Sequence, residues 1–236
     1  MAERDRPLYA VLIDADNIPA KFAAAILKEI NRFGEPAIRR VYGDWSSSRL
    51  NQWTKQVREL GLTAHQETAN TTGKNASDIG LVIDAMDVLH TGRFDGFVLV
   101  SSDSDFTALA NRIREQGLDV IGIGEEKAPD SLKKVCNRFV AIENIVEEPA
   151  PKAAGQGKSA RRDPKEAIPL IRRAMDKIDQ EAEWFSLGPL GQFIQADNSD
   201  FDARTYGKAK LSDLLEVLEV FELKKDSGQL RVRRRD

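Results

Sequence analysis

The sequence predicts an α/β protein in which helices cover a mainly parallel sheet, followed by a smaller, mostly helical domain. Short apolar runs, such as residues 8–13 and 97–100, alternate in the first part of the chain with segments of helical period. Such alternation is typical of a parallel sheet flanked by helices. Residues 148–163, which consist mostly of small and polar residues with two prolines, break the pattern, and further helical segments and a hairpin come after them.

The strands expected in the first part are short and apolar. They cover residues 8–13, 37–42, 62–66, 97–100, 118–123 and 139–142. The helices expected between them cover residues 20–33, 47–60, 77–89, 106–116 and 131–135. Gly34 and Gly61 follow the first two helices, as glycine often does at a helix end. For the helix over 77–89, the predicted buried face consists of Ile79, Val82, Ile83, Met86 and Leu89.

Residues 148–163 have little to bury, and we expect a flexible linker there, between domains over 1–147 and 164–236. The second domain is expected to contain helices over 165–178, 187–196 and 211–217, and strands over 221–224 and 229–233. In its first helix, Ile168, Ile171, Met175 and Ile178 recur along one face. Helices followed by a small hairpin indicate a winged-helix domain.

The bulk composition excludes several classes of protein. A net charge of −3 does not by itself indicate a nucleic-acid binder. The single cysteine, Cys136, excludes an internal disulfide and a thiolate zinc cluster, and His65 and His90 are not spaced as a zinc pair. No apolar stretch approaches the roughly 20 residues of a membrane span, and the N-terminus lacks the apolar core of a secretion signal. We therefore expect a soluble cytoplasmic protein.

Two acidic clusters follow two of the predicted strands. Asp14-Ala-Asp-Asn17 comes after residues 8–13, and Asp103-Ser-Asp105 comes after residues 97–100. Ligands of a parallel sheet bind at the carboxyl ends of its strands, so neighbouring strands would bring Asp14 and Asp103 together. Carboxylates gathered there repel one another unless a cation is present, which favours Mg²⁺ or Mn²⁺. Any one such aspartate taken alone is more often a turn or helix-cap residue.

Three segments resemble the NYN domain, a branch of the PIN-like nucleases. Their sequences are VLIDADN (11–17), GKNASD (73–78) continuing to IDAM (83–86), and VSSDSDF (100–106). They come in the order of the family, and the resemblance covers residues 7–145. It implies a Rossmann-like, PIN-type parallel sheet and a ribonuclease that uses Mg²⁺ or Mn²⁺ to hydrolyse RNA phosphodiester bonds.

The same resemblance implies roles for individual residues. The expected catalytic and metal-ligating residues are Asp14, Asp78, Asp103 and Asp105. The expected supporting residues are Asp16, Asn17, Ser101 and Ser102. Lys74 is a candidate for a contact with a substrate phosphate, because a mobile ammonium suits that role, although a solvated loop lysine explains it equally well.

The end of the chain resembles the OST-HTH, or LOTUS, domain. The matching sequences are WFSL (184–187), LGQFI (190–194), FDARTYG (201–207), LSDLL (211–215) and FEL (221–223). This family implies a winged helix that binds RNA or a protein partner. Arg204, Lys208 and Lys210 are candidates for contacts with RNA phosphates, and an exposed basic helix start is the alternative.

Together, the two resemblances predict a metal-dependent ribonuclease with a C-terminal RNA- or partner-binding domain. Two alternatives remain open: a non-catalytic RNA-binding regulator on the same fold, and a small-molecule phosphohydrolase. The RNA target, the cutting polarity, the number of ions, the cleavage of DNA and the formation of a homodimer are also open.

Overall fold

A computed structural model describes residues 5–66, 76–146, 161–179, 182–226 and 228–235. The chain divides into two compact units, Met1–Glu148 and Pro149–Asp236. Lys74 and most of the predicted linker, residues 148–160, lie outside the described residues. No helix in the described ranges has the length and apolar character needed to cross a bilayer.

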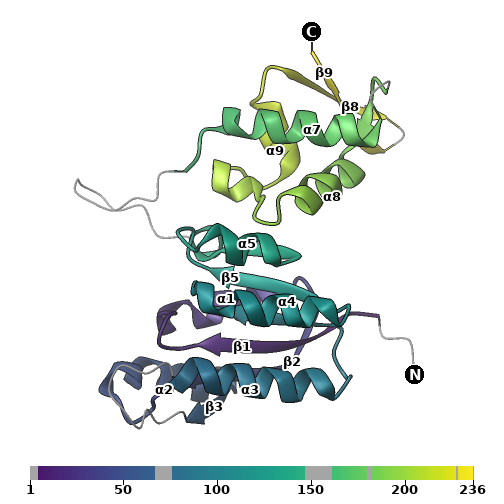
Figure 1. Cartoon of the computed structure of the whole chain (residues 1–236). Coiled ribbons are helices and arrows are strands. Elements are labelled where there is room, and N and C mark those ends of the chain that lie inside the picture. Colours follow the sequence, from purple (N-terminus) through teal and green to yellow (C-terminus); the bar gives the residue numbers. More distant parts are fainter. Residues whose placement is uncertain (1–4, 67–75, 147–160, 180–181, 227, 236) are drawn as a thin grey trace, which may run out of the picture. The chain divides into compact units, whose positions relative to one another are not determined.

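The first unit is built on a parallel sheet of six strands (Figure 1). The strands are β1 (Leu8–Asp14), β2 (Glu35–Gly43), β3 (Thr63–Gln66), β4 (Gly96–Val100), β5 (Asp119–Gly124) and β6 (Arg138–Ala141). Their order is β3-β2-β1-β4-β5-β6, so the direction of winding reverses between β1 and β4. Ile13 is in register with Val41 of β2 and with Val100 of β4. The carboxyl ends of β1 and β4 therefore lie side by side, as the sequence predicts, at the point where such sheets bind ligands.

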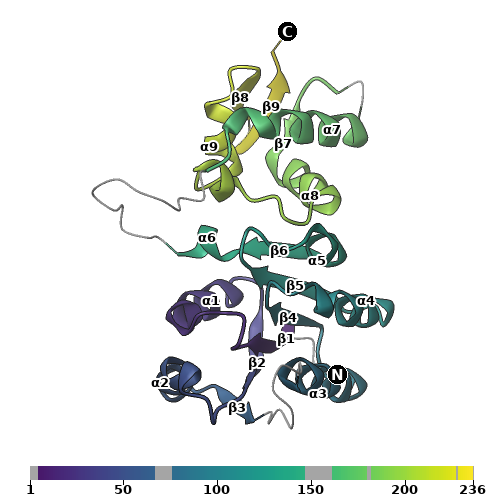
Figure 2. The ribbon, with the colours of Figure 1, turned by 60° about the vertical axis from the view of Figure 1, so that its left-hand side comes forward.

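Helices cover both faces of this sheet. They are α1 (Ala23–Ile30), α2 (Asn51–Leu60), α3 (Ala76–His90), α4 (Thr107–Glu115), α5 (Asp130–Val135) and α6 (Ile142–Ile145). Figure 2 shows α1, α2 and α6 on one face and α3, α4 and α5 on the other. Single 3₁₀ turns begin α1, α2 and α4, and α2 ends at Gly61, whose φ of 62° favours glycine. The expected alternation of strands and helices is confirmed.

Strand β1, near the middle of the sheet, contributes to a hydrophobic core on each face. Val11 and Ile13 pack on the α1–α2 side, while Ala10 and Leu12 pack on the α3–α4–α5 side. All four side chains are fully buried. Burial on both faces explains why this strand reads as a continuous apolar run rather than an alternating one.

The predicted buried face of α3 is wrong in part. Ile79 and Ile83 are 61% and 58% exposed, and Val82 and Met86 are only partly buried. The residues that face the sheet are Leu81, Ala85, Val88 and Leu89. Aliphatic residues occur around the whole helix, so their period alone does not determine which face is buried. Asp84 helps to set the rotation, because it accepts hydrogen bonds from Arg40 and Tyr42 of β2.

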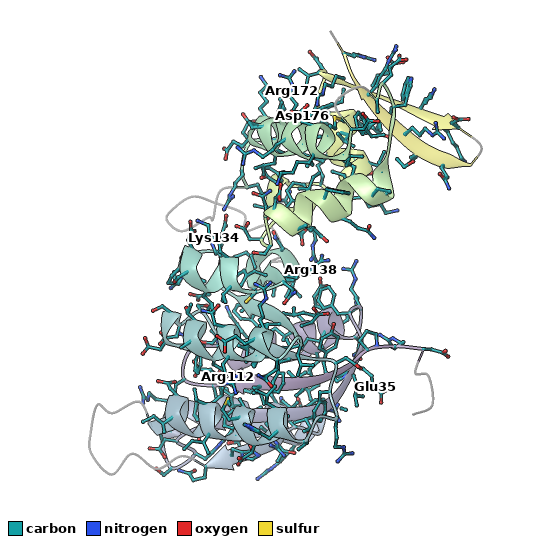
Figure 3. All side chains as sticks on the ribbon, turned by 45° about the vertical axis from the view of Figure 1, so that its right-hand side comes forward. Glu35, Arg112, Lys134, Arg138, Arg172 and Asp176 are labelled. Carbon is teal, nitrogen blue, oxygen red and sulfur yellow. The ribbon has the colours of Figure 1, made fainter. Side chains whose placement is uncertain are left out.

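The second unit combines helices with a three-stranded antiparallel sheet in the order β7-β9-β8. Its elements are α7 (Ile168–Ile178), β7 (Phe185–Ser186), α8 (Leu187–Asp197), α9 (Leu211–Glu216), β8 (Phe221–Asp226) and β9 (Gln229–Arg234). Arg172 and Asp176 lie along α7 (Figure 3), where Arg234 of β9 contacts both, reaching the Arg172 carbonyl at 3.2 Å. The predicted fold class is thus confirmed. Three short elements were not expected: the two-residue strand β7, the 3₁₀ turn Ala203–Tyr206 and, in the first unit, helix α6.

Candidate active site at the carboxyl ends of β1 and β4

Asp14, the last residue of β1, is the centre of the first acidic loop. It is 3% exposed, and the loop folds around its carboxylate. Oδ1 accepts the backbone N–H groups of Asp16 at 3.1 Å and Asn17 at 3.2 Å. Oδ2 accepts the hydroxyl of Ser101, just beyond β4, at 2.9 Å. A buried carboxylate with donors from two strands is held in one orientation.

The burial of Asp14 makes its charged form costly. Burial raises the pKa of Asp14 from 3.8 to about 6, although the hydrogen bond from Ser101 acts in the opposite direction. The neighbouring charges of Asp78 and Asp16 raise this pKa further. A nearby cation would therefore stabilise the ionised form of Asp14.

The loop after β4 is tied to the loop after β1 at a second point. The backbone N–H of Ser102 donates to Oδ1 of Asn17 at 2.8 Å. Within the β4 loop, the Asp103 N–H donates to the Ser101 hydroxyl oxygen at 3.1 Å. The Asp103 carboxylate accepts the Asp105 N–H at 2.9 Å, so it also caps the short turn before α4. The structure thus brings together all four expected supporting residues of these two loops.

The start of α3 provides the third acidic element. Burial raises the pKa of Asp78, and the charges of Asp103, Asp105 and Asp16 raise it further. The carboxylates of Asp103, Asp105 and Asp16, from the loops after β1 and β4, are therefore near enough to Asp78 to repel it. In addition, the hydroxyl of Ser77 donates to Oδ2 of Asp16 at 2.9 Å.

The donor set has the chemistry of a site for a hard divalent cation. All its charged groups are carboxylates, and the mutual repulsion described above is the kind that a cation relieves. Among the described residues, no three His, Cys, Asp or Glu side chains are close enough, as they stand, to bind one ion together. Mg²⁺ commonly retains several waters and is held by only one or two carboxylates, so this spacing still fits it.

Sequence reasoning missed two residues that shape the site. Ser77 gives no local signal, because its partner Asp16 is 61 positions away. Gly124, at the end of β5, is the other: a Cβ there would lie 2.5 Å from the Ser101 carbonyl oxygen and 2.9 Å from the Ser102 hydroxyl. A side chain at Gly124 would therefore displace the loop that carries Asp103. Glycine after an apolar strand was the available signal for this position.

Two tryptophans and an arginine of the first unit have packing roles. The indole N–H of Trp53 donates to the Ile18 carbonyl at 2.8 Å inside the core, and that of Trp45 donates to the His65 carbonyl at 2.7 Å. Arg40 is bound to Asp84. These three side chains are therefore committed to contacts within the protein.

In the second unit, the three candidate phosphate contacts differ in their surroundings. The guanidinium of Arg204 is bound to both carboxylate oxygens of Asp202, which neutralises it. Lys210 is exposed at the start of α9, in a groove of about 490 Å³ that Leu187, Leu211 and Leu230 help to line. Lys208 is partly exposed before it.

Comparison with known proteins is consistent with this geometry. The family model described as the NYN domain matches residues 9–143, and that described as the OST-HTH/LOTUS domain matches residues 158–232. No curated protein matches the chain. A crystal structure of a protein of unknown function from Vibrio parahaemolyticus is 20% identical, with a TM-score of 0.52, over 60% of this chain and 96% of that one. At this identity, the likeness concerns the fold alone.

A solution structure of an uncharacterized protein from Nitrosomonas europaea is 24% identical over 39% of this chain and 91% of that one. Its TM-score is 0.28.

Proposed function

Because the chain belongs to the NYN domain family, within the PIN-like nucleases, we propose that it is a metal-dependent ribonuclease. Its substrate would be an RNA phosphodiester bond, and its cation Mg²⁺ or Mn²⁺. The OST-HTH/LOTUS match adds a domain of RNA- or partner-binding type to the same chain. We place the protein in the cytoplasm, where its single, buried Cys136 would remain reduced.

One observation carries this proposal. Burial raises the pKa of Asp78, and the charges of Asp103, Asp105 and Asp16, which come from two loops tied together by Ser101 and Ser102, raise it further. Folding has thus gathered like charges at the carboxyl ends of β1 and β4, which opposes stability and needs a functional reason. A bound divalent cation supplies one, because it activates water and neutralises charge that develops on phosphate oxygens.

The proposed roles follow from the contacts of each residue. Asp14 and Asp78 would hold the cation, with Asp103 and Asp105 completing its surroundings directly or through water. Asp16, Asn17, Ser101 and Ser102 would fix the two loops relative to each other. No protein nucleophile is needed, since water is the attacking group. Lys208 and Lys210 would bind phosphates of the RNA, and Lys74 is also proposed for that role.

The test is cleavage of a labelled RNA by the full chain over a titration of Mg²⁺ and Mn²⁺. We expect cleavage that depends on the cation and is lost in Asp14→Asn and Asp103→Asn. Binding of RNA without cleavage across both titrations would instead indicate a regulator. Turnover of phosphomonoesters that survives deletion of residues 165–236 would indicate a small-molecule phosphohydrolase.

A further inference from the structure

Ser77 makes a contact that links α3 to the first acidic loop. Its hydroxyl donates to Oδ2 of Asp16 at 2.9 Å, across 61 positions of the sequence. The serine directly precedes Asp78, so a contact at Ser77 also locates Asp78. Asp16 in turn lies next to Ala15 and two positions after Asp14, whose Oδ1 accepts the Asp16 N–H.

We propose that Ser77 is a positioning residue that sets the distance between the first acidic loop and Asp78. This inference rests on the proposed function, because it concerns the cation of the same site. Ser77 would act through Asp16 and Asp78 and would not itself touch the cation or the substrate.

The other two loops of the site are tied directly to each other. The loops after β1 and β4 are joined by two hydrogen bonds, from Ser101 to Asp14 and from Ser102 to Asn17, at 2.9 and 2.8 Å. They also follow adjacent, paired strands. Their relative position is therefore well determined without any contribution from α3.

The first turn of α3 is held differently. The middle of the helix is attached to β2, where Asp84 accepts from Arg40. At its first turn, Asp78 is repelled by the charges of Asp103, Asp105 and Asp16. The Ser77 hydroxyl opposes that repulsion, because it is a neutral donor that holds the start of the helix to one of the repelling groups. Removing this hydroxyl would let Asp78 move away from Asp14.

The expected effect is on cation affinity. Partners that orient metal-binding side chains typically change metal affinity by about 10–100-fold when they are removed. Ser77 contacts an exposed carboxylate and not a buried one. We therefore expect the Mn²⁺ affinity to fall by about 10-fold, at the lower end of this range.

The experiment measures Mn²⁺ binding to the full chain by calorimetry, with no substrate present. The side chains introduced by Ser77→Thr and Ser77→Val have nearly the same shape, but only threonine carries a hydroxyl. We expect Ser77→Thr to bind Mn²⁺ nearly as well as the wild type and Ser77→Val to bind about 10-fold more weakly. Ser46→Ala is the matched control, because the Ser46 hydroxyl also donates to an aspartate that is partly exposed, Asp44, at 2.6 Å. Its Mn²⁺ affinity should equal that of the wild type.

A second background tests whether the effect passes through Asp16. In Asp16→Ala, replacing Ser77 with valine should cause no additional loss. Equal Mn²⁺ affinities of Ser77→Thr and Ser77→Val would overturn the role of Ser77 and leave the proposed function intact. The same conclusion would follow if Ser77→Val weakened Mn²⁺ binding as much in the Asp16→Ala background as in the wild type. A wild-type chain that binds no Mn²⁺ would overturn both.

Discussion

Oδ2 of Asp14 accepts the hydroxyl of Ser101 at 2.9 Å, which joins the end of β1 to the end of β4. Because the same hydroxyl oxygen accepts the Asp103 N–H at 3.1 Å, one serine orients both loops of the candidate site. Replacing Ser101 with alanine should therefore disturb Asp14 and Asp103 together. We expect cleavage to fall at least 10-fold, measured as kcat at saturating cation, and a smaller loss in Ser104→Ala. Unchanged kcat in Ser101→Ala would contradict this role.

Asp14 should reduce the stability of the protein at neutral pH when no cation is present. Its pKa is raised by burial to about 6 in the folded state, from 3.8. The folded state therefore binds this proton more tightly than the unfolded state. Below about pH 4 the Asp14 carboxyl is protonated in both states and costs no stability. The loss of unfolding free energy grows between about pH 4 and pH 6 and is constant above pH 6. A rise of this size corresponds to roughly 3 kcal/mol at pH 7.

Asp14→Asn removes that ionisation and keeps a similar shape. In buffer with EDTA at pH 7, we expect its free energy of unfolding to exceed that of the wild type by about 1–3 kcal/mol. The gain should disappear below about pH 4. Urea denaturation at a series of pH values measures it, and a gain that is independent of pH would show that ionisation of Asp14 is not its cause.

Divalent cations should stabilise the first unit. A cation that binds only the folded state raises the free energy of unfolding by about 2.7 kcal/mol at 100 times its Kd. We expect Mn²⁺ to raise the Tm of the wild type and EDTA to reverse the increase. Asp78→Asn should lose most of the increase, because the charge of Asp78 adds to the repulsion that the cation relieves. An increase of the same size in Asp78→Asn would place the bound ion elsewhere.

The pair between Arg40 and Asp84 should contribute to the stability of the fold. Nη1 of Arg40 lies 2.6 Å from Oδ1 of Asp84, and the two side chains are only 26% and 22% exposed. Asp84→Ala leaves Arg40 and the Tyr42 hydroxyl without this acceptor. We expect a loss of about 1–3 kcal/mol in urea denaturation.

The exposed pair of Lys55 and Glu59, at 3.7 Å, is the control for this measurement. Glu59→Ala should change the stability by less than about 0.5 kcal/mol. Similar losses in the two variants would mean that burial adds nothing to the Arg40–Asp84 pair.

The basic residues of the second unit should differ in their effect on RNA. Lys208→Ala and Lys210→Ala should each weaken RNA binding severalfold and reduce its salt dependence, because each removes a candidate phosphate contact. Arg204→Ala should mainly affect stability, since the guanidinium is held by Asp202. Fluorescence anisotropy over a salt series separates the two effects. An Arg204 variant that is stable but loses the most RNA affinity would reverse this assignment.

Sequence reasoning succeeded where the physical cause is local or repeated. The strands were identifiable because burial on both faces requires continuous apolar runs, as in β1 and β4. The nearness of the loops that carry Asp14 and Asp103 followed from the adjacency of those strands. Sequence reasoning did not identify the buried face of α3 correctly, because that helix has aliphatic residues on all sides. It also missed the contact between Ser77 and Asp16, which depends on how distant segments pack and leaves no local pattern.

The described acidic residues of the candidate site all lie in one unit of the fold, between Asp14 and Asp105. The groups proposed for chemistry and those proposed for recruitment are therefore separable parts. Exchanging the second unit for an unrelated RNA-recognition fold should preserve the cutting reaction and redirect it to other transcripts. With the proposed activity, the same division would let the first unit serve as a portable RNA-cutting domain in engineered RNA processing.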